Sequence, residues 1–237
     1  MNEYREKGLR KTHSQANKEI DSAFLEDLLK QITTLPPDFH KAGCLSVDRL
    51  EAINCHLPVL PLDHSLETGS GLSTLLLSNI SRHHLVFSLD GGNGSLENVR
   101  KSSLFEKNNT EIIEGPTQHT LPKYSFQYKL DFALIDGPHG FPFPQIEYYY
   151  VYQHLKTGAI MVLDDIHIPS ITDLFNFINE DEMFELLEVV NKTTAIFRRT
   201  SAPVFSPFGD NWWTQKYNKK NFPESLLDEK LRNLLER

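Results

Sequence analysis

Between residues 62 and 165 the chain alternates short runs of β-forming residues with stretches of helical character. The β-type runs cover residues 62–68, 83–90, 110–115, 130–137 and 158–165, and helical stretches at 71–80, 95–108 and 145–156 separate several of them. Strands that alternate with helices in this way predict a parallel sheet with right-handed crossovers and helices on both faces. We therefore expect an α/β fold built as a three-layer sandwich.

The pattern changes after residue 165. A helical stretch at 171–183 is followed by two β-type runs, 184–190 and 193–200, which predict an antiparallel hairpin around Asn191-Lys192. Upstream, two further helices are expected at 17–35 and 46–57. The resulting division is a helical extension over residues 1–44, a main domain over 45–200, and a C-terminal lid and helix over 201–237.

Composition limits the class of protein. The chain has 237 residues, of which 39% are hydrophobic and 24% charged, as in an ordinary globular protein. No apolar run reaches the roughly 18–20 residues of a membrane span, and the polar N-terminus lacks a signal-peptide core. The two cysteines, Cys44 and Cys55, indicate no disulfide framework. We therefore expect a cytoplasmic protein that does not bind membranes.

The charge distribution argues against a partner made of nucleic acid. The net charge is −8, and residues 19–197 carry 11 basic and 25 acidic residues. A protein that tracks phosphates needs clustered cations instead. We therefore expect no nucleic-acid partner.

Polar, small or acidic residues follow all five predicted parallel strands. They occupy positions 67–71, 90–92, 115–118, 136–139 and 164–167. Ligands of doubly wound sheets bind beyond the carboxyl ends of the strands, so these positions predict one binding site. Gly69 and Gly71 permit a tight turn whose following helix offers free N–H groups. Asp90, 21 residues after Gly69, stands where a carboxylate accepts from a ribose diol.

Several nucleotide-binding classes fit this turn poorly. It lacks the Gly-Lys-Ser/Thr of a P-loop, and Ser73 or Thr74 replaces the third glycine of a dinucleotide fingerprint. Glu67 would face a pyrophosphate, whereas a ligand with an ammonium and a sulfonium would attract it. An NAD(P)-dependent oxidoreductase of Rossmann type and a non-catalytic cofactor-binding scaffold remain alternatives.

Two segments carry a family resemblance. "LETGSGLST" and "LDFALIDGPHGFPFPQIEYYYVYQHLKTGAIMVLDDI" resemble the class I S-adenosylmethionine-dependent methyltransferases. The branch most similar has a fourth strand that ends in Ile-Asp-Gly-x-His and a fifth that ends in Asp-Asp, and it includes small-molecule O-methyltransferases. The resemblance covers roughly residues 45–200. It implies a Rossmann-like, seven-stranded, mostly parallel sheet with a reversed last strand.

The resemblance also implies roles for individual residues. Methyl transfer to an oxygen of a small molecule would use S-adenosylmethionine as cofactor. Its methionine end would contact the first turn, its ribose would contact Asp90, and Asp136 would complete the site. Its adenine would contact Thr117 and Gln118, after the third strand. The implied cofactor-binding set is Glu67, Gly69, Ser70, Gly71, Asp90, Thr117, Gln118 and Asp136.

The acids at the fourth and fifth strand ends raise the question of a metal. Asp136, Asp164 and Asp165 should lie close together at the carboxyl ends of these strands, where like charges need compensation. Carboxylates with an imidazole nearby suit Mg²⁺ or another divalent cation, which matches relatives that hold a metal at these positions. Alternatively, Asp136 caps a turn, Asp164 supports the cofactor and Asp165 points to solvent. His139, with Asp136, is the candidate catalytic group, because imidazole titrates near neutrality.

Aromatic residues outside the strand ends have competing interpretations. Tyr148, Tyr149, Tyr150 and Tyr152 stand at helical spacing and are expected to pack against the sheet. The tryptophans at 212 and 213 would cover an apolar substrate or bury a subunit contact. The last helix has an apolar stripe, which favours a homo-oligomer formed through the terminal helices.

Overall fold

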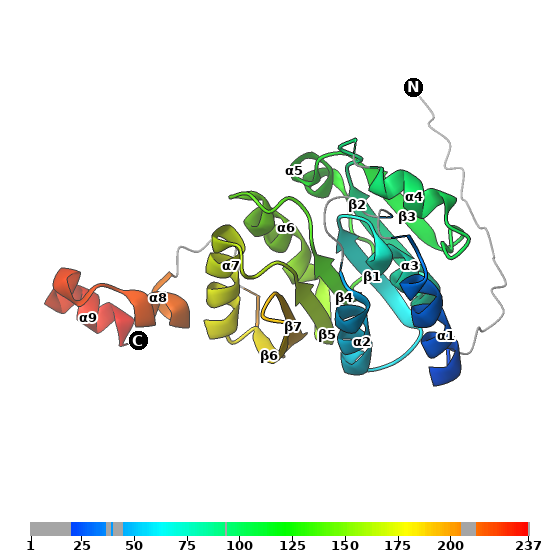
Figure 1. Cartoon of the computed structure of the whole chain (residues 1–237). Helices are drawn as coiled ribbons and strands as arrows, with labels where there is room; N and C mark the ends of the chain where they lie inside the picture. The colour runs from blue at the N-terminus through cyan, green and yellow to red at the C-terminus, as the bar shows by residue number, and fades with distance from the viewer. Residues whose placement is uncertain (1–19, 37–38, 40–44, 93, 205–211, 237) are drawn as a thin grey trace, which may run out of the picture.

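The computed structural model describes residues 20–36, 39, 45–92, 94–204 and 212–236. Its centre is one seven-stranded sheet with the strand order β3-β2-β1-β4-β5-β7-β6 (Figure 1). The first five strands pair in parallel, and β7 runs antiparallel to both of its neighbours. The strands are β1 Leu62–Thr68, β2 Ser81–Ser88, β3 Thr110–Glu114, β4 Leu130–Ile135, β5 Leu155–Leu163, β6 Phe184–Val190 and β7 Thr194–Arg199. The predicted α/β fold with a reversed last strand is therefore confirmed.

Helices cover both faces of this sheet. The helices in the described part of the chain are α1 Ser22–Thr33, α2 Val47–His56, α3 Leu72–Ile80, α4 Ser95–Lys101, α5 Thr117–Thr120, α6 Phe143–Val151, α7 Pro169–Glu180, α8 Lys216–Asn221 and α9 Glu229–Leu235. The first three share a hydrophobic cluster on one face, whereas α6 and α7 share a second cluster on the other. None of the described helices is long and apolar enough to cross a lipid bilayer.

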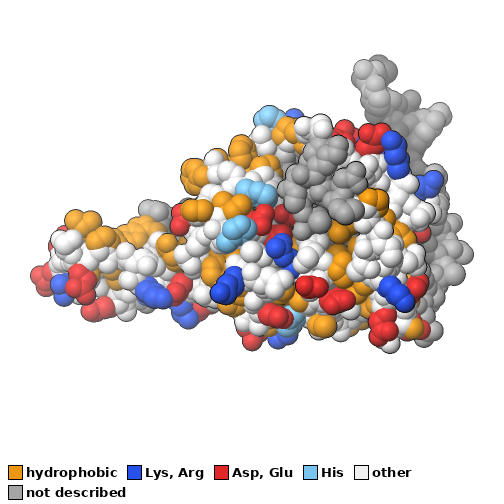
Figure 2. All heavy atoms as spheres, in the orientation of Figure 1, with side chains coloured by type: hydrophobic (Ala, Val, Ile, Leu, Met, Phe, Trp, Pro, Cys, Tyr) orange, Lys and Arg blue, Asp and Glu red, His pale blue; other side chains and the backbone are white. Residues whose placement is uncertain are grey.

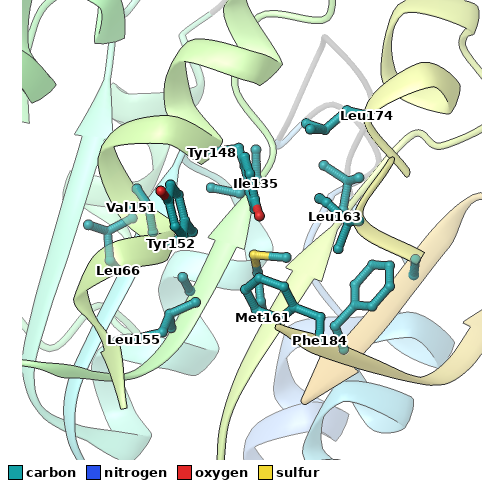
Figure 3. Packing of buried hydrophobic residues seen from close by; sticks show 14 of the residues in the cluster. Leu66, Ile135, Tyr148, Val151, Tyr152, Leu155, Met161, Leu163, Leu174 and Phe184 are labelled. Carbon is teal, nitrogen blue, oxygen red and sulfur yellow. The ribbon is translucent and has the colours of Figure 1, made fainter. Parts of the chain in front are cut away.

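The middle strands are buried on both faces because their alternate residues enter different clusters. Met161 and Leu163 of β5 belong to the cluster under α6 and α7, and Ile160 and Val162 belong to the cluster under α1 to α3. Figure 3 shows Met161 and Leu163 between the sheet and the residues of α6 and α7. A continuous apolar run is expected of a parallel strand that is covered on both sides. This burial fixes the strand ends relative to one another.

The tyrosine run on α6 packs mainly as the sequence predicts. Tyr148 and Tyr152 are buried, and their rings stack with centroids 4.9 Å apart (Figure 3). Tyr149 faces outward and is 50% exposed. The helix is shorter than expected, since α6 ends at Val151 and β5 already begins at Leu155. Gly158 has a positive φ of 85° and lies inside β5.

The C-terminal segment forms an arm, defined here as residues 212–236. It extends from the body beside α7, and hydrophobic side chains lie along it (Figures 1 and 2). Tyr217 of α8 contacts Phe177 of α7, and the ring of Trp212 stacks on Phe222 within the arm. Neither tryptophan lines the cleft described below. The three-part division of the chain and the oligomer through the terminal helices stay predictions, and the basic N-terminal residues 1–18 lie outside the described part.

The hairpin between β6 and β7 contains two residues with left-handed backbone. Asn191 and Lys192 have φ values of 51° and 62°, and the N–H of Thr193 donates to the carbonyl of Val190 at 3.0 Å. This is the geometry of a type I′ turn, in which asparagine followed by glycine is the preferred pair. Lysine at the second position therefore carries backbone strain, because its Cβ is disfavoured at positive φ.

Replacing Lys192 with glycine should stabilise the protein. The strain relieved exceeds the entropy that glycine adds to the unfolded chain, so we expect Lys192→Gly to raise the free energy of unfolding by about 0.5–1 kcal/mol. Lys192→Ala is the control, because it shortens the side chain but keeps the Cβ. Urea unfolding of the three proteins measures the effect. An equal gain from alanine would assign it to the lysine side chain rather than to the backbone.

Candidate functional site

A cleft of about 470 Å³ opens at the carboxyl ends of the five parallel strands. This volume lies within the range of about 300–1,000 Å³ that is usual for small-molecule sites. Each of the five strand ends contributes to its wall, as the sequence predicts for the edge of a parallel sheet. The strand-end residues that line it include Gly69, Ser70, Ser88, Gly115, Thr117, Gln118, Asp136, His139, Asp164 and Asp165.

The turn after β1 holds three strand ends together. Gly69 has a φ of 90°, and a Cβ on it would lie 2.4 Å from the carbonyl oxygen of Asp136. Its N–H donates to the carbonyl of Phe87 at the end of β2, 2.9 Å away. The hydroxyls of Ser70 and Ser88 lie 2.9 Å apart. Only glycine fits position 69, since any side chain would collide with the end of β4.

Glu67 is turned away from the cleft. Its side chain is fully buried, accepts a hydrogen bond from the Ser73 hydroxyl at 2.6 Å, and lies 3.1 Å from Nε2 of His84. Gly71 also does not line the cleft, and its N–H donates to the hydroxyl of Thr74. The structure therefore uses both residues to brace the start of α3. A direct contact of either with the methionine end of a cofactor stays a prediction.

Asp90 lies two residues beyond the end of its strand. The sequence predicts a strand over 83–90, whereas β2 covers Ser81–Ser88. The carboxylate of Asp90 accepts from the N–H groups of Gly92 and Gly94, at 3.3 and 3.1 Å, and does not line the cleft. The carboxylate of Asp90 therefore caps its own turn in this structure. The ribose role of Asp90 stays a prediction.

Asp136, His139 and Asp165 form a cluster at one side of the cleft. One ligating atom of each lies within 4.8 Å of the other two. Nε2 of His139 is 3.2 Å from Oδ2 of Asp165 and 3.8 Å from Oδ1 of Asp136. Desolvation raises the pKa of Asp136 to about 7, and the carboxylates of Asp136 and Asp165 raise the pKa of His139. The imidazole is thereby stabilised in its protonated form.

Asp165 reaches this cluster through strained backbone. Its φ is 55°, a left-handed conformation that few residues other than glycine adopt, most of them asparagine, aspartate or histidine. Strain of this kind is found most often at functional sites, where the surrounding structure maintains it. Here it turns the carboxylate of Asp165 toward His139, with His167 on its other side at 3.7 Å.

Asp164 has different partners from Asp136 and Asp165. It is 4% exposed, accepts from the Thr194 hydroxyl at 2.5 Å, and forms an ion pair of 3.2 Å with Arg49 of α2. Burial raises the pKa of Asp164, and the bond from Thr194 and the charge of Arg49 oppose that shift. The predicted metal set was Asp136, Asp164 and Asp165. The geometry groups His139 with Asp136 and Asp165, and it places Asp164 against Arg49.

Sequence reasoning missed two charged residues of the site. Arg49 lines the cleft from α2, a helix that was expected but whose faces were not assigned. Glu147 of α6 lies beneath the cleft floor, where its carboxylate accepts from Thr68 at 2.8 Å. The same Thr68 hydroxyl accepts from the N–H of Asp136 at 3.0 Å. The sequence did contain a signal for Glu147, because a glutamate that stands beside tyrosines expected to pack against the sheet is itself expected to be buried.

Glu147 also fixes the residue that follows Asp136. Its side chain is fully buried, and a Cβ built on Gly137 would lie 1.9 Å from its carboxylate. Burial raises the pKa of Glu147 to about 7, and the nearby Thr117 and Thr68 hydroxyls partly oppose this shift. The carboxyl group therefore favours its neutral form over much of the range below neutrality.

Comparison with known proteins agrees with this geometry. Residues 66–166 match the family model described as a methyltransferase domain. No curated protein matches the sequence. This part of the chain is therefore similar to a methyltransferase domain, and the chain spans nearly the full length of the solved structures described next.

Solved structures share the fold at low sequence identity. One is the O-methyltransferase NovP, with a TM-score of 0.58 and 18% identity, covering 76% of this chain and 99% of that chain. The O-methyltransferase TomG from Streptomyces achromogenes, in complex with SAM, has a TM-score of 0.54 and 13% identity over 77% and 92% of the two chains. The O-methyltransferase from Bacillus cereus, in complex with SAH, has a TM-score of 0.52 and 16% identity over 78% and 92%.

The buried carboxyl group of Glu147 predicts a pH-dependent stability. Because its folded pKa is raised from 4.5 to about 7, the folded state binds more protons between these values and loses stability as the pH rises through them. Relative to Glu147→Gln, the wild type should lose up to about 3 kcal/mol between pH 4.5 and 7.5. Urea unfolding at several pH values tests this. The exposed Glu97→Gln is the control, and parallel pH curves for wild type and Glu147→Gln would contradict the prediction.

Proposed function

We propose that this protein uses its methyltransferase domain to move a methyl group from S-adenosylmethionine to an oxygen of a small molecule. The observation that carries the proposal is the convergence of five strand ends on one cleft with an acidic cluster at its side. Two of the similar folds are described as complexes with SAM or SAH, and all three are described as O-methyltransferases. These descriptions support the choice of cofactor and of an oxygen acceptor.

The cleft offers suitable groups for the adenine and for the positively charged parts of the cofactor. Thr117 and Gln118, after β3, supply polar groups beside which the adenine would lie. The Gly69–Ser70 turn lets the backbone approach the sulfur-bearing portion closely. The sulfonium and the α-ammonium carry positive charge, which the carboxylates of Asp136 and Asp165 would stabilise. A dinucleotide would instead place a negative pyrophosphate near these acids.

The transfer itself is an in-line displacement. The acceptor oxygen forms a bond to the methyl carbon while the carbon–sulfur bond breaks, which leaves S-adenosylhomocysteine as a neutral thioether. The acceptor's proton must leave its oxygen, and His139, which lies in the cleft, would receive it at a ring nitrogen in its neutral form. Asp136 and Asp165 would stabilise the imidazolium that results. The remaining contribution of the protein is to hold the two reactants about 3 Å apart and to exclude water.

A divalent cation fits the same cluster. Asp136, Asp165 and His139 would supply two carboxylate oxygens and one imidazole nitrogen, a mixed donor set that first-row divalent ions accept. When bound, such an ion would lower the pKa of an acceptor hydroxyl. His139 cannot ligate through Nε2 and also keep that nitrogen for Asp165. The cluster can therefore either hold a metal ion or pair His139 with Asp165, and experiments can distinguish these two roles.

Cofactor binding is the direct test. Isothermal titration should show that the wild type binds S-adenosylhomocysteine and does not bind NAD. Gly69→Ala should reduce the affinity at least tenfold, because the added Cβ would meet the carbonyl of Asp136 at 2.4 Å. Gly91→Ala is the matched control, since its Cβ would meet nothing within 4 Å. Binding of NAD without S-adenosylhomocysteine would refute the proposed function and support the oxidoreductase alternative.

Metal use is tested separately by thermal shift. Addition of Mn²⁺ or Mg²⁺ should raise the melting temperature of the wild type, because a ligand that binds only the folded state stabilises it. Asp165→Ala should abolish most of that shift, whereas Asp63→Ala should keep it, as this exposed acid belongs to β1 at the other end of the sheet. Equal shifts for wild type and Asp165→Ala would exclude this cluster as the metal site.

A further inference from the structure

Arg49 brings a fixed positive charge into an otherwise acidic cleft. Among the described residues that line the cleft, it is the only lysine or arginine, whereas three aspartates line the same cavity. It comes from the first turn of α2, a helix that precedes residues 66–166, the stretch that matches the methyltransferase family model. Its side chain is 19% exposed. A guanidinium that lines a binding cleft is expected to bind a negatively charged group of the ligand.

The ion pair with Asp164 uses only part of the guanidinium. The contacts of Arg49 with both Asp164 oxygens, at 3.2 and 3.4 Å, are made by the same nitrogen, Nη1. Its Nε is buried and has no hydrogen-bond partner in the described part of the chain. A buried donor without a partner is costly, so a small shift of the side chain that brings this nitrogen to an acceptor on a ligand would be favoured. Guanidinium donors match carboxylate oxygens in a two-point geometry.

The proposed methyl donor has one group that the acidic cleft would otherwise repel. Its amino-acid portion carries an α-carboxylate in addition to the two positive centres, and that carboxylate needs a donor. The N-terminus of α3 offers fewer free hydrogen-bond donors than the sequence suggests. The N–H of Gly71 already donates to Thr74, and the hydroxyl of Ser73 donates to Glu67. Across the sheet, Thr117 follows β3 and Asp164 follows β5, at opposite sides of the cleft. A ligand whose adenine lies beside Thr117 would point its amino-acid end toward Arg49.

We propose that Arg49 binds the α-carboxylate of the methyl donor and is held in position by Asp164. This inference rests on the proposed function, and it assigns the amino-acid end of the ligand to a residue outside the matched domain. Asp164 acts as a positioning residue, which explains why it stands apart from the Asp136, His139 and Asp165 cluster. The site therefore discriminates for a carboxylate at that end of the ligand.

The test compares two ligands that differ only in this carboxylate. S-adenosylhomocysteine and its decarboxylated form are titrated into wild type, Arg49→Met and Arg49→Lys. We expect the wild type to prefer S-adenosylhomocysteine by about 10- to 100-fold, the range of a charge-assisted hydrogen bond. Arg49→Met should bind the two ligands with nearly equal affinity, and Arg49→Lys should keep part of the preference. The decarboxylated ligand should lose less than about threefold in Arg49→Met.

A second variant separates this role from folding. Arg49→Met leaves Asp164 buried and unpaired, so it is expected to be destabilised, whereas Arg49→Met/Asp164→Asn removes the unpaired charge. The double variant should recover stability without recovering the preference for the carboxylate. Equal weakening of both ligands, or an unchanged preference in Arg49→Met, would overturn the assignment while the proposed function stands. Failure of the wild type to bind either ligand would instead reject the proposed function itself.

Discussion

The site depends on the close contact between the turn after β1 and the end of β4. These two strands are neighbours in the sheet, although β2 and β3 come between them in the chain. The strand order changes direction here, which is where α/β sheets bind their ligands. Gly69 permits the contact because it places no Cβ against the Asp136 carbonyl. Without it, the cleft floor and the acid at the end of β4 could not keep their present positions.

Electrostatic balance is the second constraint on this cleft. Three aspartates line it, but they do not have the same environment. Arg49 and Thr194 stabilise Asp164, while Asp136 and Asp165 share the imidazole of His139. Repulsion between the like charges is therefore reduced by an ion pair at Asp164 and by the imidazole of His139 at Asp136 and Asp165. A positively charged donor or a divalent ion would complete the balance at Asp136 and Asp165.

The sequence was sufficient to predict the sheet, the reversed strand and the common edge at which the strand ends meet. Those features follow from apolar periodicity and from glycine and acidic residues at strand ends, which are local signals. Asp90 shows the limit, because β2 ends two residues earlier than its apolar run suggests, and this shift points the carboxylate into its own turn. Arg49 and Glu147 could not be assigned, because the role of a helical residue depends on which face packs against the sheet. Three-dimensional packing alone supplies that information.

The central claim is that one nucleoside ligand lies across all five strand ends with its sulfur beside the acidic cluster. A crystal structure of the protein grown with S-adenosylhomocysteine tests this most directly. The account predicts the adenine beside Thr117 and Gln118, and the sulfur near the Gly69 turn and Asp136. Electron density for the nucleoside at another surface, with this cleft empty, would contradict the account.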